Sequence, residues 1–515
     1  MAHSIDTDRE DSTKPVLRAG DTCWRISRAD RFALVVDAAD YFAAARTAML
    51  KAKHTIVLIG WDFDLRISLQ PDGISDGAPQ QLGHFLKHVV KRNPDLRISI
   101  LKWDMAVLFT IRNQLLPILA LDLATSNNIR MRFDSSHPWT AAHHQKIVVI
   151  DDALAFCGGI DMTSERWDTR EHRPGDERRK RPDGSLFGPW HDATAIVDGN
   201  AARALGEIAN QRWHHATGER LDRPEFPRDD MDALWPDEIE PQFRNVDVGI
   251  ARTMPEHREQ PAIHEIEALY TAAIQSARRT IYLESQYFAS VRICELIADR
   301  LREPDGPEVI VINPLSAEGW LEQQTMDTAR NLRLRALTKA DLHGRFGIFH
   351  PVNDAGEPIY VHAKILIVDD QFIRVGSSNV NNRSMGFDTE CDLAIEAGSD
   401  KESATIKSIR NDLLAEHLGV RADNIEEAAG EHGSLLTAVQ KLRRSSGRSL
   451  RPIPIRETND TQEAVARSHL ADPERAKHAE RRIGHFAKSL LLRVPVAASL
   501  VVCAAGAALL LFAIT

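Results

Sequence analysis

Two stretches of the chain carry the same three residue types at the same spacing, a set suited to chemistry on a phosphate ester. Each stretch reads His-x-Lys-x-x-x-x-Asp, and the residues are His144, Lys146 and Asp151 in the first copy and His362, Lys364 and Asp369 in the second. An imidazole can attack phosphorus or transfer a proton, and a lysine ammonium neutralises phosphate charge. Because an unperturbed imidazole has a pKa of about 6.5, two histidines facing one phosphate can hold opposite protonation states near neutrality.

The two copies belong to an internal repeat. The same separation in sequence relates three pairs of residues, namely His144 and His362, Gly158 and Gly376, and Asp161 and Asn379. Both motifs also run into a glycine-containing turn, CGGID after the first and VGSSN after the second. Three landmarks at one separation indicate duplication of a whole unit rather than two chance matches.

The motifs need elements that bring their side chains to one place. On a strand, alternate side chains share a face, so each histidine emerges beside the lysine two positions later. The apolar runs that follow, IVVI and ILIV, are typical of strands buried on both faces in a sheet covered by helices. A helix over residues 38–52 and a strand over residues 55–60 precede the first motif, and the block IHEIEALYTAAIQSARRTIYLESQYF repeats this plan before the second. The alternation predicts an α/β sheet domain that is used twice.

The paired motifs and their glycine turns resemble those of the phospholipase D superfamily, which includes phosphatidylserine and cardiolipin synthases and some nucleases. The resemblance covers roughly residues 20–400 and extends to bacterial cardiolipin synthase-like and other phospholipase D-like membrane-associated proteins. It implies an α/β fold in which two tandem phospholipase D-like α/β/α halves form one pseudo-twofold catalytic domain.

The resemblance also implies roles for the histidines and lysines. In that family the reaction passes through a covalent phosphohistidine, and the histidine of the first motif is most often the nucleophile. We therefore assign attack to His144 and acid–base transfer to His362, although the sequence alone does not separate the two roles. Lys146 and Lys364 are expected to bind phosphate oxygens.

Four carboxylates are implied to support these groups. The motif aspartates, Asp151 and Asp369, are expected to hold the site structurally rather than to transfer protons. In this family each histidine is oriented by a carboxylate further along the chain. Glu390, in TECDLAI, matches that position in the second half, and Asp192, in WHDATAIV, is its expected counterpart in the first.

The turns after the motifs carry the remaining candidate ligands of phosphate. Ser377 and Asn379 match phosphate-contacting positions of the family in the second turn. Asp161 stands where many relatives carry Asn, and an anionic side chain beside phosphate is unexpected, so a contact role for it is in question. We expect no metal and no cofactor, because the lysines supply the positive charge and no cluster of carboxylates in the sequence indicates a metal site.

Four smaller features carry secondary expectations, two of them with open alternatives. A short hairpin is expected before residue 38. Trp103 and Asp104 end a predicted strand and either lie near the cleft or pack at the rim of the core. His143 lies on the opposite face from the catalytic candidate beside it and is not expected to react. Residues 169–188 are charged and rich in Pro and Gly, which predicts a mobile, solvated loop that caps the cleft or carries specificity.

The end of the chain predicts a membrane anchor. Residues 494–515 carry no charge, and at about 1.5 Å per residue this stretch is long enough to cross a hydrocarbon core of about 30 Å. Basic residues precede it, so the large domain is expected on the cytoplasmic side; the alternative is a buried C-terminal helix. The predicted organisation is a disordered tail (1–20), a first half (21–235), a second half (245–440), a linker with a charged juxtamembrane segment (441–485) and the anchor (494–515).

The composition of the chain argues against some classes of function. The 515-residue chain has a net charge of −10, which argues against a general nucleic-acid binder, and its five scattered cysteines indicate a reducing compartment rather than a disulfide framework. We expect an enzyme of the phospholipase D or phosphatidyltransferase type that acts on phospholipid at a membrane, with water or an alcohol as acceptor. The alternatives are a metal-independent nuclease of the same superfamily and an inert membrane scaffold.

Overall fold

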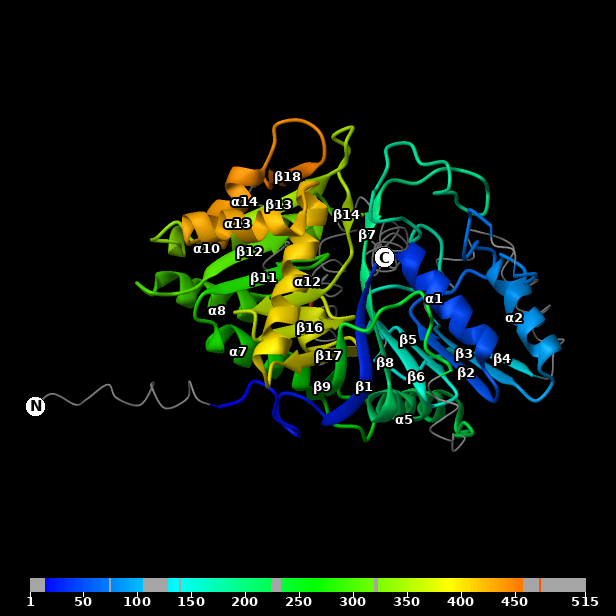
Figure 1. The fold of residues 1–515 in the computed structure, drawn as a ribbon. Helices are drawn as coiled ribbons and strands as arrows, with labels where there is room; N and C mark the ends of the chain where they lie inside the picture. Colours follow the sequence, from blue (N-terminus) through cyan, green and yellow to red (C-terminus); the bar gives the residue numbers. More distant parts are fainter. Residues whose placement is uncertain are drawn as a thin grey trace, which may run out of the picture.

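In the computed structural model the described residues are 14–73, 76–104, 128–138, 140–223, 233–318, 323–456 and 472–473. They form a mixed α/β fold built on one sheet of 16 strands, with helices on both faces (Figure 1). At its centre β1 (Arg25–Val36) pairs antiparallel with β9 (Phe243–Met254). These two long strands join the part of the chain before residue 223, called here the N-terminal segment, to the part from residue 233 to 456, the C-terminal segment.

The strands on either side of this central pair follow the same order. Outward from β1 they are β8 (Ala193–Asp198), β6 (Leu154–Gly158), β5 (Ile147–Ile150), β2 (Thr55–Gly60), β3 (Arg97–Trp103) and β4 (Ile129–Asp134). Outward from β9 they are β17 (Glu390–Glu396), β16 (Phe372–Gly376), β15 (Ile365–Val368), β11 (Thr280–Glu284), β12 (Glu308–Ile312), β13 (Phe346–Val352) and β18 (Ser449–Pro452). A short strand, β10 (Ile263–His264), also pairs with β9.

Helices cover the sheet because its strands are apolar on both faces. The runs IVVI in β5 and ILIV in β15 are buried at every position, as the sequence predicts for strands between two helical layers. In the N-terminal segment the helices are α1 (Ala38–Lys51), α2 (Leu82–Arg92) and α5 (Gly199–Thr217). In the C-terminal segment they are α7 (Glu265–Ser276), α8 (Val291–Arg302), a π-helix (Gln323–Asp327), α10 (Thr328–Ala340), α11 (Asn382–Gly386), α12 (Asp400–Leu418), α13 (Ala422–His432) and α14 (Leu435–Leu442).

The core is divided by the sheet. On one face a single apolar cluster extends from α5 to α12 and crosses from the N-terminal to the C-terminal segment. On the other face, α1 and α2 cover a separate cluster in the N-terminal segment, and α7 and α8 cover another in the C-terminal segment. The continuous cluster makes the two segments one packed body, so residues from both can hold fixed positions relative to each other.

A second, two-stranded sheet joins the segments close to the motifs. In it β7 (Trp190–His191) pairs parallel with β14 (Tyr360–Val361), which immediately precedes His362. Figure 1 shows β7 and β14 side by side between the two sets of strands. The pairing fixes the start of the second motif against the N-terminal segment.

Several boundaries differ from the sequence-based expectations. The expected hairpin before residue 38 is one continuous strand, β1, which the central pairing with β9 extends. Within the tail predicted over residues 1–20, the backbone amides of Val16 and Leu17 donate to Glu396, so this part of the chain is attached to the fold. The linker predicted from residue 441 contains β18, which adds to the sheet beside β13.

The predicted anchor, residues 494–515, lies outside the described residues, as do residues 1–13. Among the residues that the structure describes, no helix combines the length and the apolar character that crossing a bilayer requires.

Candidate active site

The two motif histidines lie immediately before buried strands and are fixed by contacts with the other segment. The amide of His144 donates to the carbonyl of Thr389 at 3.0 Å, and the amide of His362 donates to the carbonyl of His191 at 2.7 Å. β5 and β15 then run into the interior of the sheet. The backbone of each motif is therefore positioned by a residue from the opposite segment.

The side chains are paired across the segments in the same way. Nδ1 of His144 lies 3.0 Å from Oε2 of Glu390, and Nδ1 of His362 lies 2.7 Å from Oδ2 of Asp192. Sequence reasoning selected both carboxylates but assigned each to the histidine of its own half, and that assignment is wrong. Because each carboxylate holds Nδ1, the other ring nitrogen, Nε2, is left to face a substrate.

The two lysines lie beside these histidines. Nζ of Lys146 donates to the carbonyl of His144 at 3.0 Å and lies 3.1 Å from Oδ2 of Asp161. Nζ of Lys364 lies 3.1 Å from Nδ1 of His362 and also donates to the carbonyl of that residue. Both ammonium groups are buried. They place two positive charges next to the two imidazoles, where the charge of a phosphate would need compensation.

Asp161 acts as a partner of lysine in this arrangement. Besides its ion pair with Lys146, its Oδ1 accepts from the amide of Trp61 at 2.9 Å. Its carboxylate is thus occupied by protein groups, which explains how an anionic side chain is accommodated near a phosphate site.

The turn after the second motif supports Glu390. The hydroxyl of Ser377 donates to Oε2 of Glu390 at 2.5 Å, and the hydroxyl of Ser384 donates to Oε1 at 2.7 Å. Nδ2 of Asn379 donates to Oε1 of Gln286 at 3.4 Å, and its buried Oδ1 has no hydrogen-bond partner among the described residues. Ser377 is therefore committed to the carboxylate, whereas Asn379 keeps one polar atom available.

The motif aspartates point away from the histidines and bind backbone. Asp151 accepts from the amides of Lys53, His54 and Thr55, each at 2.7 Å. Asp369 does the same for the turn before β11 and accepts from the amides of Arg279 and Thr280 at 2.7 Å. Each aspartate fastens the end of its motif strand to the start of the neighbouring strand, which accounts for its place in the motif.

Glycine in the first turn is required by the close approach of Asp192. A Cβ atom on Gly159 would lie 2.2 Å from Oδ1 of Asp192, well inside van der Waals contact. Any larger residue at position 159 would displace the carboxylate that holds His362.

The electrostatics of the site follow from its burial. Burial lowers the pKa of His144 and of His362 well below the usual range, and Lys146 and Lys364 add to this effect. Burial also lowers the pKa of Lys364 to about 7 and raises the pKa of Glu390 to about 7. A phosphate anion placed beside His144 and His362 would favour the protonated form of one imidazole, because an opposite charge stabilises the cation.

With this geometry established, the chain can be compared with known proteins. A family model described as Phospholipase D matches residues 48–293 and 352–455, which is more than half of the chain. The chain belongs to the phospholipase D family. The first range contains His144 and Asp192, and the second contains His362 and Glu390. Each range therefore holds one complete motif and the carboxylate that orients the histidine of the other motif.

Curated relatives of this phospholipase D family chain are distant and longer. It is 25% identical to phospholipase D A of Dictyostelium discoideum in an alignment of 449 positions that covers 75% of this chain and 34% of the relative. It is 24% identical to phospholipase D alpha 4 of Arabidopsis thaliana in an alignment of 496 positions that covers 75% of this chain and 64% of the relative. The chain thus spans about a third to just under two thirds of the length of these relatives.

A solved structure shares the fold. The crystal structure of phosphatidylserine synthase from Haemophilus influenzae Rd KW20 covers 76% of this chain and 88% of its own, with a TM-score of 0.51 and 14% sequence identity. At this identity the likeness concerns the fold alone.

Aromatic side chains border the second histidine of this phospholipase D family site. The ring of Trp190 stacks on Tyr360 with centroids 4.6 Å apart and lies 5.3 Å from the ring of His362. The guanidinium of Arg166 lies 4.3 Å from the Trp190 centroid. Sequence reasoning did not select these residues, because β7 and β14 bring them together only in the folded chain.

Three further features singled out in the sequence include buried side chains. Trp103 is buried and donates from Nε1 to His137 at 3.1 Å, so it packs in the core. His143 is buried away from the reacting pair, with Nε2 3.1 Å from Asp134. The loop predicted over residues 169–188 is not simply solvated, because His172 and Arg179 within it are buried.

Proposed function

We propose that this chain is a phospholipase D-type phosphodiesterase and transphosphatidylase that acts on phospholipid through a phosphohistidine intermediate. The observation that carries the proposal is the crossed pairing of two motif histidines with Glu390 and Asp192, beside two buried lysines. A site of this kind offers a neutral imidazole, a second imidazole that can carry a proton, and cationic compensation for phosphate.

In the proposed first step, Nε2 of His144 attacks phosphorus and forms a P–N bond. The ester P–O bond breaks, and the leaving alkoxide takes a proton from Nε2 of His362. The burial and nearby lysines that lower the pKa of His144 support its role as a neutral nucleophile. Glu390 accepts the Nδ1–H of that ring and compensates the positive charge that develops on it during attack.

In the second step, water or an alcohol gives its proton to the now neutral His362. Its oxygen attacks phosphorus, and the P–N bond to His144 breaks. The products are a phosphatidic acid when water attacks and a new phosphodiester when an alcohol attacks. The two outcomes differ only in the acceptor, so one site serves hydrolysis and transfer.

We further propose that the reacting site lies between tandem phospholipase D-like halves, 21–235 and 245–440, related by a pseudo-twofold axis near β1 and β9. The equivalent strand orders on the two sides of this pair support the duplication, as does the match of equivalent bonds at Asp151 and Asp369. Each half then supplies one histidine, one lysine and the carboxylate that orients the other histidine.

Phospholipid is the proposed substrate because the relatives are named phospholipases D and the related fold belongs to a phosphatidylserine synthase.

Residues 494–515 remain the proposed anchor, with the catalytic domain at the cytoplasmic face. Removal of these residues should release the protein from membranes while activity on a dispersed short-chain phospholipid is kept. Continued sedimentation of the shortened protein with membranes would contradict the anchor.

The direct test is lipid mass spectrometry after incubation of the purified protein with phosphatidylglycerol, with and without an added alcohol acceptor such as ethanol. We expect phosphatidic acid in water, a phosphatidyl alcohol when the acceptor is added, and neither product with His144→Ala. A parallel incubation with DNA tests the alternative class. Cleavage of DNA by the wild type with all lipid intact would overturn the proposal in favour of a nuclease.

A further inference from the structure

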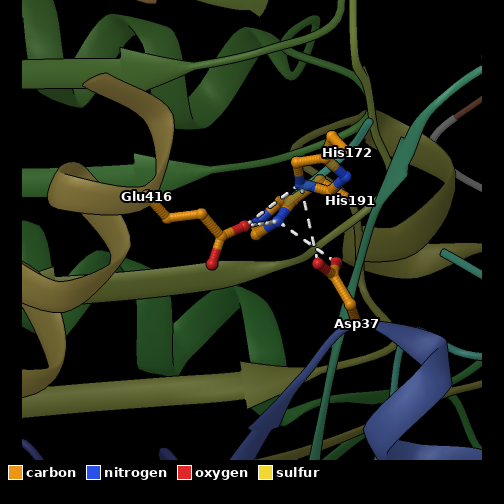
Figure 2. Close-up of side chains that lie close together, drawn as sticks. All are labelled: Asp37, His172, His191 and Glu416. Atoms are coloured by element: carbon orange, nitrogen blue, oxygen red, sulfur yellow. Dashed lines mark hydrogen bonds and ion pairs between the residues drawn. The ribbon is translucent and has the colours of Figure 1, made fainter. Parts of the chain in front are cut away.

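A second group of titratable side chains lies behind the reacting histidines. It consists of Asp37, His172, His191 and Glu416, which are all buried and whose ligand atoms lie within 4.8 Å of one another. Figure 2 shows the two imidazoles between the two carboxylates. Asp37 precedes α1, His172 belongs to the 169–188 segment, His191 ends β7, and Glu416 lies near the end of α12. The group therefore joins the N-terminal and C-terminal segments.

The separations within the group are close to those of a metal coordination shell. Nε2 of His172 lies 3.2 Å from Oε1 of Glu416 and 3.6 Å from Oδ2 of Asp37. Nδ1 of His191 lies 2.9 Å from Oε1 of Glu416 and 3.4 Å from Oδ1 of Asp37. In a tetrahedral zinc site with bonds of about 2.0–2.2 Å, neighbouring ligand atoms lie about 3.3–3.6 Å apart. The two distances to Asp37, one to each of its carboxylate oxygens, lie within that range, and the two distances to Oε1 of Glu416 are shorter.

Each histidine also has the outer partner that metal-binding histidines use. Nδ1 of His172 lies 2.9 Å from Oδ2 of Asp168, and Nε2 of His191 lies 2.7 Å from Oε2 of Glu284. A ligating imidazole directs one nitrogen to the metal and donates its other N–H to a carboxylate, which fixes the ring and strengthens it as a ligand. Here the outer nitrogens are held by separate carboxylates, while the inner nitrogens point to the same place.

The two carboxylates of the group are oriented by different means. Oε2 of Glu416 accepts from Nε of Arg170 at 2.5 Å, which leaves Oε1 directed at the histidines, 4.0 Å from Nη2 of Arg448. Oδ1 of Asp37 accepts from the amide of Asp192 at 3.0 Å. Oδ2 of Asp37 is buried in the group and has no hydrogen-bond partner among the described residues. An unpaired carboxylate oxygen in a buried place is costly, and a cation bound to it would remove that cost.

The backbone of Asp37 has an unusual conformation, and its side chain does not cap the helix that follows. Its backbone has a φ of 67°, a left-handed conformation that non-glycine residues adopt at a cost. Asp37 makes no side-chain capping bond to α1, and its Oδ2 instead lies 3.6 Å from Nε2 of His172.

We propose that Asp37, His172, His191 and Glu416 bind one divalent transition-metal cation, for which Zn²⁺ is the probe. Two imidazoles and two carboxylates suit Zn²⁺ and similar ions of borderline softness. The two negative charges of the carboxylates balance the charge of the cation. Because four protein ligands close the coordination shell in the interior, the site is structural and takes no part in the reaction steps.

The site stabilises the geometry around the second reacting histidine. The amide of Asp37 donates to the carbonyl of Asp192 at 2.8 Å, and the carbonyl of His191 accepts from the amide of His362. A cation bound to Asp37 and His191 thus fixes the backbone on both sides of the Asp192 carboxylate. It also ties α12 of the C-terminal segment to these residues through Glu416.

A neighbouring set of three residues, His191, Glu284 and His417, offers a control. It shares His191 with the proposed site, and Nε2 of His417 lies 3.1 Å from Oε1 of Glu284. Glu284 also accepts from the hydroxyl of Tyr282, so its oxygens are already satisfied by donors. Substitution of His417 removes this set and leaves the four proposed ligands intact, whereas substitution of His172 does the reverse.

The experiment measures metal directly and needs no lipid substrate, so its outcome is independent of the proposed enzyme activity. The full chain is stripped with dipicolinate, exposed to ZnCl₂, passed through gel filtration and analysed by elemental mass spectrometry. We expect about one zinc per chain in the wild type and in His417→Gln, and a loss of at least about fivefold in His172→Gln. Added Zn²⁺ should raise the melting temperature of the first two proteins only.

X-ray absorption spectra of the zinc-loaded wild type keep the proposal testable when His172→Gln does not fold. We expect a shell of nitrogen and oxygen atoms at about 2.0–2.2 Å that includes two imidazoles. The proposal is overturned when the wild type retains no zinc, when His172→Gln retains as much as the wild type, or when the spectra show fewer than two imidazoles.

Discussion

Nδ1 of His144 lies 3.0 Å from Oε2 of Glu390, a residue 246 positions later in the chain. The reciprocal contact joins His362 to Asp192 across 170 positions. Neither motif therefore contains the group that orients its own imidazole. Each imidazole is oriented by a carboxylate of the opposite segment, so the geometry around both histidines depends on the packing of the two segments.

Replacement of Glu390 by Gln should lower kcat by about 10²- to 10⁴-fold, with a smaller change in KM. The amide keeps the size of the side chain but cannot compensate the positive charge that forms on His144 during attack. Phospholipid turnover under saturating substrate measures the effect. Ser384→Ala is the matched control, because it removes a hydroxyl bound to Oε1 of Glu390 but keeps the carboxylate. Its loss should be about tenfold or less, and equal losses in both variants would contradict the role of the charge.

The motif aspartates should matter for stability more than for turnover. Asp151→Ala leaves three backbone amides, those of Lys53, His54 and Thr55, without their acceptor. We expect the free energy of unfolding to fall by about 3 kcal/mol, measured from urea denaturation, while kcat of the folded fraction stays within about fivefold of the wild type.

Asp152→Ala controls for the backbone at this position. Asp151 and Asp152 both have left-handed φ values, 52° and 55°, so alanine at either position meets similar strain. The carboxylate of Asp152 instead pairs with Arg223, which is partly exposed, and its loss should cost about 1 kcal/mol or less. Equal destabilisation by the two substitutions would show that strain, rather than the three amide bonds, decides the effect.

A buried histidine outside the reacting pair should make the fold sensitive to acid. Burial and the nearby Arg212 guanidinium lower the pKa of His143 to about 3, below the value near 6.5 expected in the unfolded chain. As the pH falls from about 6.5, the unfolded state binds a proton that the folded state does not, so stability is lost.

Removal of this histidine tests the linkage. His143→Gln should flatten the fall in unfolding free energy between about pH 6.5 and 4, a difference of about 3 kcal/mol at most. Urea denaturation at several pH values measures the slope. His84→Gln, at an exposed position on α2, should leave the slope unchanged. A slope that is the same in His143→Gln and the wild type would assign the acid sensitivity to other groups.

Local sequence patterns correctly predicted several strands and one helix. The strand expected over residues 55–60 is β2 (Thr55–Gly60), and the helix expected over 38–52 is α1 (Ala38–Lys51). The runs IVVI and ILIV are buried strands. Periodicity and apolar content fix such elements from neighbouring residues, so little information from the rest of the chain is needed.

Contacts between distant residues set the features that the sequence did not predict. The partner of each histidine depends on how the segments pack. β18 is a strand because β13 offers it an edge, and its own residues resemble a basic linker. His172 is buried in a charged stretch because the carboxylates of Asp168 and Glu416 lie against its two ring nitrogens. In each case a tertiary partner outweighs a local preference.

The roles of the two reacting histidines can be separated by the leaving group. His144→Ala should abolish any covalent phosphoenzyme, because it removes the imidazole whose Nδ1 is held by Glu390 and whose Nε2 would attack phosphorus. His362→Ala should slow departure of an alkoxide that needs a proton. With a nitrophenyl ester, whose leaving group needs none, His362→Ala should still form the adduct and then stall, since no base activates the second acceptor. Acid-quench trapping of labelled protein measures the adduct. An adduct that persists in His144→Ala and is absent in His362→Ala would exchange the two roles and would place the nucleophile on the imidazole that Asp192 orients.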